Sequence, residues 1–145
     1  MNNARISRIE LSDASGPVAP RHAYRESIVV TASDSGVTVA RERRDASGEH
    51  DDERTLAPGV FERLSRALLA ELPIGTKLDL VGEKAQNKGV SANHVTIESD
   101  GETARLDYLS SHLDEDDGDA RARAIVAAVR AFFGATNENR SDDAP

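Results

Sequence analysis

Two stretches of the chain, 65 residues apart, share one order of patterns: a β-branched hairpin, a charged segment and an amphipathic helix stripe. The first turn is Ser33-Asp34-Ser35-Gly36 and the second is Ser99-Asp100-Gly101-Glu102. Gly36 and Gly101 differ by 65 positions (101 − 36 = 65), and the same shift aligns the apolar helix positions. Duplication and convergence on a common ββα plan both account for the match. In either case, the expected packing is two helices on one face of an antiparallel sheet.

Alternating β-branched and apolar residues indicate the strands. If the four residues of each turn are unpaired, Ala32 faces Val37 in the first hairpin and His94 faces Asp107 in the second. We expect an α+β fold whose mainly antiparallel sheet has five or six strands, a usual number, with two helices packed on one face. The expected strands are Arg5–Leu11, Tyr24–Ala32, Val37–Arg44, Lys77–Val81, Ala92–Glu98 and Thr103–Leu109.

Apolar residues at helical spacing predict two helices. The first is expected over Pro58–Leu72, because proline is favoured in a first turn and Pro73 disfavours helix before it. The second is expected to begin within Asp114–Asp119 and to end at Phe133, before the glycine Gly134. The expected stripes are Val60, Phe61, Leu64, Ala67, Leu68 and Leu72, and Ala122, Ile125, Val126, Val129 and Phe133.

The remaining segments are expected to lack regular structure. Asp45–Thr55 is charged and has no periodicity, which is typical of a mobile loop. Gly82–Val90 is expected to be a second loop. The length of 145 residues suits a single domain, expected over residues 1–134, with a disordered tail over 135–145.

Composition excludes several functional classes. The chain has no cysteine, so disulfides, thiolate catalysis and Cys-ligated zinc are excluded. Its net charge of −8 argues against nucleic-acid binding, which needs a basic surface. No apolar run approaches the roughly 20 residues of a membrane span, and no signal peptide is recognisable at the N-terminus. We therefore expect a soluble, cytoplasmic protein that binds neither nucleic acid nor membrane.

His94 and Asp107 are the best candidates for chemistry. A carboxylate beside an imidazole orients the ring, as general-base sites require. The competing interpretation is an exposed cross-strand pair, and such pairs are common. No nucleophile motif accompanies the pair, so catalysis is not the favoured interpretation.

Other charged groups suggest binding or helix capping. Asp114–Asp119 does not match a calcium loop, because Leu113 and Ala124 occupy ligand positions, so no metal site is expected. Loop lysines and strand arginines are the candidate binding residues, with solvated turns and protection of an edge strand as competing interpretations. The candidate binding residues are Lys84, Lys88, Arg41, Arg43, Arg105 and Tyr108.

From about Ile6 to Phe133, the order of short strands around a central helix, then a hairpin and a final helix, resembles the layout of small bacterial emfourin-type protease inhibitors. The chain departs from that layout at Asp13-Ala14-Ser15-Gly16, where a glycine pair is expected after the first strand.

The expected function is a non-catalytic module of the inhibitor, immunity or adaptor type that binds another protein through a sheet face, an edge strand or loops. No cofactor is expected, and the protein is expected to be a monomer or a small homo-oligomer. The alternatives are a small enzyme or ligand-binding protein that uses His94 and Asp107, and a homo-oligomeric structural protein.

Overall fold

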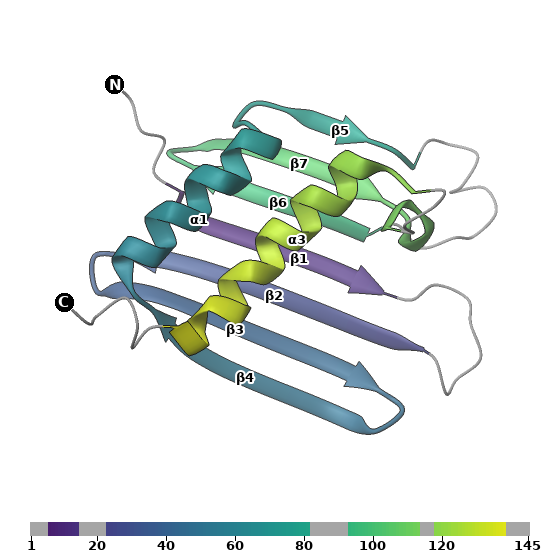
Figure 1. The fold of residues 1–145 in the computed structure, drawn as a ribbon, viewed down its shortest axis with the longest axis horizontal. Coiled ribbons are helices and arrows are strands. Elements are labelled where there is room, and N and C mark those ends of the chain that lie inside the picture. The colour runs from purple at the N-terminus through teal and green to yellow at the C-terminus, as the bar shows by residue number, and fades with distance from the viewer. Residues whose placement is uncertain (1–5, 15–22, 82–92, 114–117, 139–145) are drawn as a thin grey trace.

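The computed structural model describes residues 6–14, 23–81, 93–113 and 118–138, which form two layers (Figure 1). One layer is a sheet of seven strands among these residues, in the order β4-β3-β2-β1-β6-β7-β5. The other layer is the helices α1 (Pro58–Glu71) and α3 (Ala120–Gly134), and both lie on the same face of the sheet. The strands are β1 (Arg8–Ala14), β2 (Tyr24–Ser33), β3 (Gly36–Asp45), β4 (Gly48–Leu56), β5 (Lys77–Asp79), β6 (Asn93–Ser99) and β7 (Glu102–Tyr108).

Strand β1 occupies the centre of the sheet. It pairs antiparallel with β2 on one edge and with β6 on the other, so Ile9 lies between Val30 and Ile97. Within the described ranges, β5 and β7 form the one parallel pair. The predicted α+β class, the antiparallel sheet and the two helices on one face are confirmed. The expected number of five or six strands is too low.

The additional strand is β4, where the sequence predicts a mobile loop over Asp45–Thr55. That prediction is wrong, because β4 pairs with β3 along its whole length, from Asp45 opposite Gly48 to Val37 opposite Leu56. Gly48 has a φ of 119°, a conformation that glycine adopts readily at a tight turn. Backbone pairing with β3, rather than burial of apolar side chains, holds this segment in place.

Both predicted hairpin registers are confirmed. Ala32 lies opposite Val37, and His94 lies opposite Asp107. The turns are tighter than expected, because Ser33 also pairs with Gly36 and Ser99 with Glu102. In the second turn Asp100 and Gly101 have φ values of 48° and 83°. Two consecutive positive φ values match a type I′ turn, which suits the twist of antiparallel strands.

The structure does not confirm a ββα repeat. The unpaired turn residues begin at Asp34 in the first hairpin and at Asp100 in the second, a shift of 66 residues (100 − 34 = 66) rather than 65. The first half also places β4 between its hairpin and its helix. The second half has only the 3₁₀ helix η2 (Ser110–Leu113) at that point of the described chain.

Several predicted boundaries differ from the observed ones. Strand β1 begins at Arg8 and ends at Ala14, three residues later than expected, because its pairing with β2 extends to Arg25 opposite Ala14. Strand β5 ends at Asp79 rather than at Val81. The predicted loop Gly82–Val90 lies outside the described residues.

The start of α3 is capped as its acidic flank predicts. Asp119 is the N-cap residue, and its Oδ1 accepts a hydrogen bond from the backbone N–H of Ala122 at 2.9 Å. At the other end, Gly134 belongs to the helix, and the chain continues as the 3₁₀ helix η3 (Ala135–Glu138). Ala135 is buried, and η3 covers the first four residues of the segment for which the sequence predicts a disordered tail. Residues 139–145 lie outside the described ranges.

The core lies between the helices and the sheet, and it is mostly aliphatic. Alternate residues of β1 and β2 face the helices, and the stripes of α1 and α3 cover them. The two helices contact each other through Phe61 and Phe132, whose ring centroids are 6.0 Å apart. The largest fully buried side chains are Tyr108, Phe132, Ile9, Leu11, Ile28, Leu68, Leu72, Ile97, Leu106, Ile125, Val30 and Val39.

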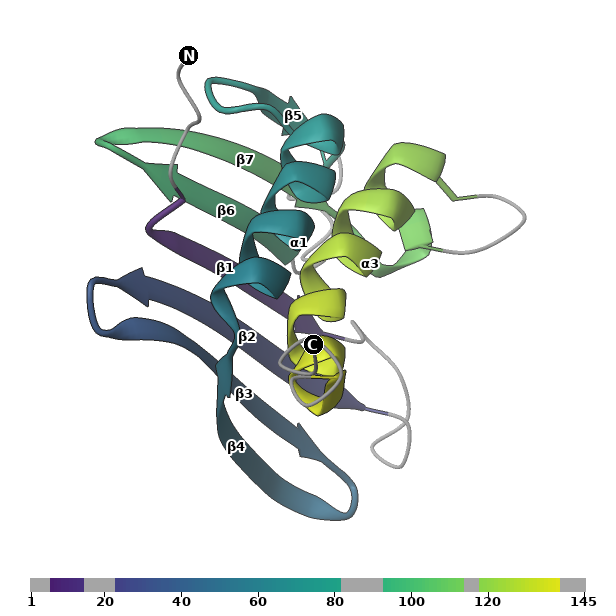
Figure 2. The same ribbon diagram turned by 60° about the vertical axis from the view of Figure 1, so that its left-hand side comes forward.

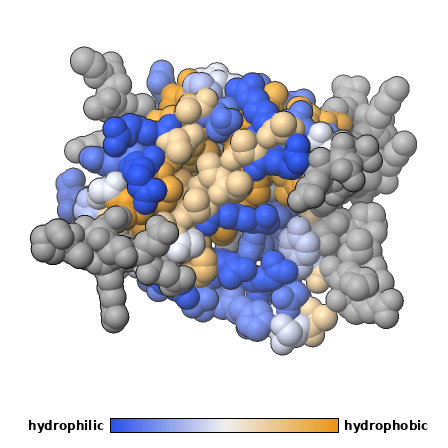
Figure 3. All heavy atoms as spheres, viewed as in Figure 1, coloured by the Kyte–Doolittle hydropathy of each residue, from blue (hydrophilic) through white to orange (hydrophobic). Residues whose placement is uncertain are grey.

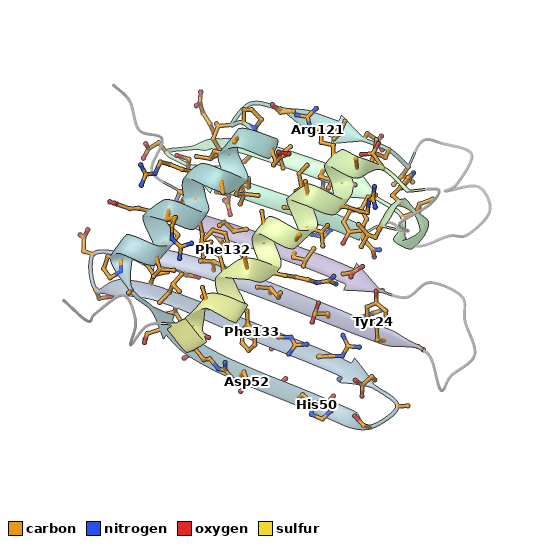
Figure 4. The ribbon with its side chains drawn as sticks, viewed as in Figure 1. Tyr24, His50, Asp52, Arg121, Phe132 and Phe133 are labelled. Carbon is orange, nitrogen blue, oxygen red and sulfur yellow. The ribbon has the colours of Figure 1, made fainter. Side chains whose placement is uncertain are left out.

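Two adjacent phenylalanines test this packing. The sequence stripe assigns Phe133 to the core, but the structure buries Phe132 completely and leaves Phe133 partly exposed beneath the guanidinium groups of Arg41 and Arg54 (Figure 4). We predict that Phe132→Ala lowers the free energy of unfolding by about 3–5 kcal/mol, as buried aromatic truncations do. Phe133→Ala is expected to cost about 1–2 kcal/mol, from partial burial and cation–π contact. Urea unfolding of both variants measures the difference, and equal losses would contradict the assigned packing.

Candidate binding surface

The sheet has two different faces. Helices α1 and α3 cover one face, and no described element lies over the other, which we call the helix-free face (Figure 2). Antiparallel sheets commonly leave one face open to solvent, and that face is then polar. The residues that lie on the helix-free face include Arg8, Glu10, Ser27, Val29, Thr31, Thr38, Glu42, His94, Thr96, Arg105 and Asp107.

The predicted pair His94 and Asp107 lies on this face, but the two side chains have different partners. The Nε2 atom of His94 is 3.1 Å from Oε1 of Glu10, on the neighbouring strand β1. Both carboxylate oxygens of Asp107 accept hydrogen bonds of 3.1 Å from Nε of Arg105, and Oδ1 forms an ion pair with Nη2 at 2.9 Å. The carboxylate that orients the imidazole is therefore Glu10, which the sequence did not identify because β1 and β6 are far apart in the chain.

Hydrogen bonds and ion pairs stabilise the charged forms of Glu10 and Arg105. The hydrogen bond from His94 holds the pKa of Glu10 below its usual value, and Arg8 at 2.9 Å acts in the same direction. The hydrogen bond to Asp107 raises the pKa of Arg105. Charges of both signs therefore alternate across the centre of the helix-free face, each held by a neighbour.

The other candidate binding residues do not lie on this face. Arg41 and Arg43 project from the helix side of β3, and Tyr108 is fully buried on the helix side of β7. Because β3 lies between β2 and β4, the two arginines do not protect a sheet edge. Lys84 and Lys88 lie outside the described residues.

A buried ionic cluster, which the sequence did not reveal, lies where β1, β2 and α3 meet. Arg130 of α3 contacts two buried carboxylates, with Nη2 2.5 Å from Oδ2 of Asp13 and 3.2 Å from Oε1 of Glu26. Arg41 donates to the other oxygen of Glu26 at 2.8 Å, and the Tyr24 hydroxyl donates to Asp13 at 3.2 Å. The cluster adds ion pairs between α3 and the sheet to the apolar contacts of the helix, which continue at Phe132.

The alternation of inward and outward residues along β1 and β2 contains a sequence signal for this cluster. Asp13 continues the inward series of Ile9 and Leu11, and Glu26 precedes the inward residues Ile28 and Val30. A charged residue at an inward position needs a partner of opposite charge. The sequence does not identify Arg130 as that partner, because the partner depends on how α3 lies across the strands.

Burial dominates the electrostatics of Asp13. It raises the pKa of the Asp13 carboxyl, and the positive charge of Arg130 opposes that effect. Burial also raises the pKa of the Tyr108 hydroxyl. Among the described residues, neither the Oδ1 atom of Asp13 nor the Tyr108 hydroxyl has a hydrogen-bond partner at normal geometry, although both atoms are buried. The cluster is therefore an imperfectly satisfied structural element.

Beyond α3 the helix side of the sheet is strongly hydrophilic, over β2, β3 and β4 (Figure 3). Arg43 lies over the Tyr24 ring at 4.8 Å and donates to Asp45 at 3.0 Å. Hydrogen bonds from Ser47 and Arg43 lower the pKa of Asp45 to about 2. On β4, His50 and Asp52 are exposed beyond the cover of the helices (Figure 4).

A shallow cavity of about 290 Å³ lies at the outer end of the sheet, over β2, β3 and β4. Charged groups dominate its lining, and His94 is not among them. The lining residues are Arg25, Ser27, Glu42, Arg43, Arg44, Glu49 and Asp51.

Two searches of the described residues bear on function. No group of three or more His, Asp or Glu side chains in these ranges is arranged to hold a metal ion. Neither α1 nor α3, the longest helices described, is long and apolar enough to cross a membrane.

No protein-family model matches the chain, and no curated protein or solved structure matches it significantly. Function is therefore inferred from the surface of the chain itself.

Two carboxyls whose pKa values are displaced in opposite directions give a pH prediction. Because the folded pKa of Asp13 is raised, its contribution to stability is greatest in acid and is lost as the pH rises through that pKa. We predict that the stability of Asp13→Asn relative to wild type increases from pH 4 to pH 7. The reason is that the wild-type carboxyl acquires a buried charge over this range, whereas the amide stays neutral.

Asp45→Asn provides a control of opposite sign. Because the folded pKa of Asp45 is lowered, its contribution is present at neutral pH and is lost in acid. The stability of Asp45→Asn relative to wild type should therefore decrease as the pH rises from about 2 to about 4, between the folded pKa and the usual pKa of Asp. Urea unfolding at several pH values measures both slopes. A difference between Asp13→Asn and wild type that does not change with pH would contradict the assigned environment of Asp13.

Proposed function

We propose that the protein is a non-catalytic module that binds another protein through the helix-free face of its sheet. The observation that carries this proposal is that one face of a seven-stranded sheet is free of every described element, whereas the other face holds both helices. This surface extends to β4, beyond the part of the sheet that the helices cover (Figure 2). The resemblance of the sequence layout to that of small protease inhibitors is in line with a role of the inhibitor, immunity or adaptor type.

The order of the charged side chains supports binding. Arg8 and Glu10 are 2.9 Å apart, and Glu10 in turn contacts His94. Arg105 and Asp107 form a second pair on the same face. Side chains already held in one geometry lose little conformational entropy on association, so such a surface binds at lower cost than a mobile one.

The pair of Glu10 and His94 supports a second candidate, a small enzyme or ligand-binding protein. In that case Glu10, rather than Asp107, orients the imidazole, because it lies 3.1 Å from Nε2. The pair lies outside the described cavity, which favours the binding module. A small-molecule screen by thermal shift distinguishes the candidates, because a ligand of this site stabilises wild type and not His94→Gln.

Capture from a native lysate of the source organism tests the proposal. The double variant His94→Ala/Arg105→Ala removes an imidazole and a guanidinium group from the centre of the helix-free face. We predict that proteins retained by immobilised wild type are retained about tenfold less by this variant, the loss produced by about 1.4 kcal/mol of binding free energy. Quantitative mass spectrometry of the retained proteins measures the change.

The matched control is Glu62→Ala/Arg66→Ala, which removes two charged groups from the exposed side of α1. It should retain the same proteins as wild type, and circular dichroism should show that both variants are folded. Equal loss in the two variants, or no retained protein that depends on the helix-free face, would contradict the proposal.

A further inference from the structure

Strand β4 forms one outer edge of the sheet, so its backbone pairs with β3 on one side only. It is nine residues long, and only Leu56 at its end is buried. Its residues from Gly48 to Glu53 are exposed on both faces of the sheet. An exposed edge of this length presents free N–H and C=O groups to which another strand can pair.

From Gly48 to Glu53, the side chains of β4 on the helix-free face are all acidic, and Thr55 follows them on the same face. Glu49, Asp51 and Glu53 alternate along the strand and so project to the same side. Glu49 forms an ion pair with Arg44 of β3. Asp51 and Glu53 form no ion pair with any described residue.

The neighbouring strand increases this negative charge. Asp51 lies directly opposite Glu42 of β3, and Glu53 lies opposite Ala40. Glu42 also has no ion-pair partner among the described residues. Like charges directly opposite each other destabilise a sheet. Arg25 and Arg44 line the same cavity as Glu42 and Asp51 and offset part of this charge. The edge therefore keeps a net negative charge, which a basic neighbour would neutralise.

The same charges disfavour pairing with a second copy of the chain. Antiparallel pairing of β4 with itself about Asp52 places Asp51 opposite Glu53 and the two Asp52 residues opposite each other. In-register parallel pairing places each carboxylate beside its own copy. Both arrangements juxtapose carboxylates, so charge selects against self-association and for a cationic partner.

We propose that the β4 edge binds an extended segment of a partner protein that carries Lys or Arg at alternate positions. The segment adds to the sheet as an eighth strand, and its basic side chains lie on the helix-free face against Asp51 and Glu53. On the helix side, β4 presents His50, Asp52 and Arg54, which have no common charge. The intervening residues of the segment are therefore not required to be basic. This inference rests on the proposed protein-binding function and names the partner chemistry at one end of that surface.

A labelled peptide matched to the length of β4, with alternating Thr and Lys, is the probe. Fluorescence anisotropy measures its affinity, and amide chemical shifts locate its site. We predict that Asp51→Lys/Glu53→Lys weakens binding about tenfold or more, because it reverses the charges that select the peptide. The same variant should bind the corresponding Thr and Glu peptide more tightly than wild type does.

Asp34→Lys/Glu62→Lys is the matched control, because it changes the net charge by the same amount at exposed positions away from β4. It should bind the Lys peptide within about twofold of wild type, since screened charges at this distance contribute little. Equal weakening by the two variants would show only a general attraction to an acidic protein, and this result would overturn the proposal.

Backbone methylation distinguishes strand addition from charge attraction alone. Only every second N–H of an added strand faces the sheet edge. One Lys peptide is N-methylated at the odd-numbered residues and a second at the even-numbered residues. The peptide whose methyl groups face the sheet edge should lose binding, and the other should retain it. Retention by both peptides would overturn strand addition.

The remaining outcomes separate this inference from the proposed function. A wild-type dimer in analytical ultracentrifugation that Asp51→Lys/Glu53→Lys abolishes would assign the edge to a second copy and overturn the inference. Failure of the Lys peptide to bind, combined with lysate capture that depends on His94 and Arg105, would overturn the inference and leave the proposed function standing. Failure of both would overturn both.

Discussion

The fold depends on the pairing of β1 with strands on both of its edges. The hairpin β2–β3 and the hairpin β6–β7 are local structures, and neither buries enough apolar surface to be stable alone. Strand β1 joins them, with Leu11 between Ile28 and Val95. Because Leu11 is fully buried beneath the helices, the same strand also anchors the core. The two helices therefore have one continuous surface to cover.

The helix side of the sheet is not uniform. The two helices cover the centre of the sheet, where the inward residues are aliphatic. At the strand ends near the β3–β4 turn the inward positions become charged, and Arg130 of α3 forms ion pairs there with Asp13 and Glu26. Burying charges at such a site carries a desolvation cost that pairing only partly offsets. The outer strand β4 consequently has little core of its own, and its residues from Gly48 to Glu53 are exposed.

The sequence predicted the local pairings well, because each hairpin is defined by a short turn between alternating runs. It therefore placed His94 opposite Asp107 correctly. It missed the contact of His94 with Glu10, because the pairing of β1 with β6 joins segments more than 80 residues apart. It missed β4 because a strand exposed on both faces has no apolar alternation to detect. It assigned Phe133 rather than Phe132 to the core, because a helical stripe leaves adjacent positions at its border ambiguous without the partner surface.

Amide hydrogen exchange measured by NMR tests whether β1 joins one sheet whose edge strand β4 is ordered mainly by backbone pairing with β3. We expect the amides of β1 to exchange only through global unfolding. We also expect the amides of β4 to alternate between slow exchange, where they bond to β3, and fast exchange, where they face outward. Uniformly fast exchange over residues 48–56, or amides of β1 that exchange as fast as those of β4, would contradict this arrangement.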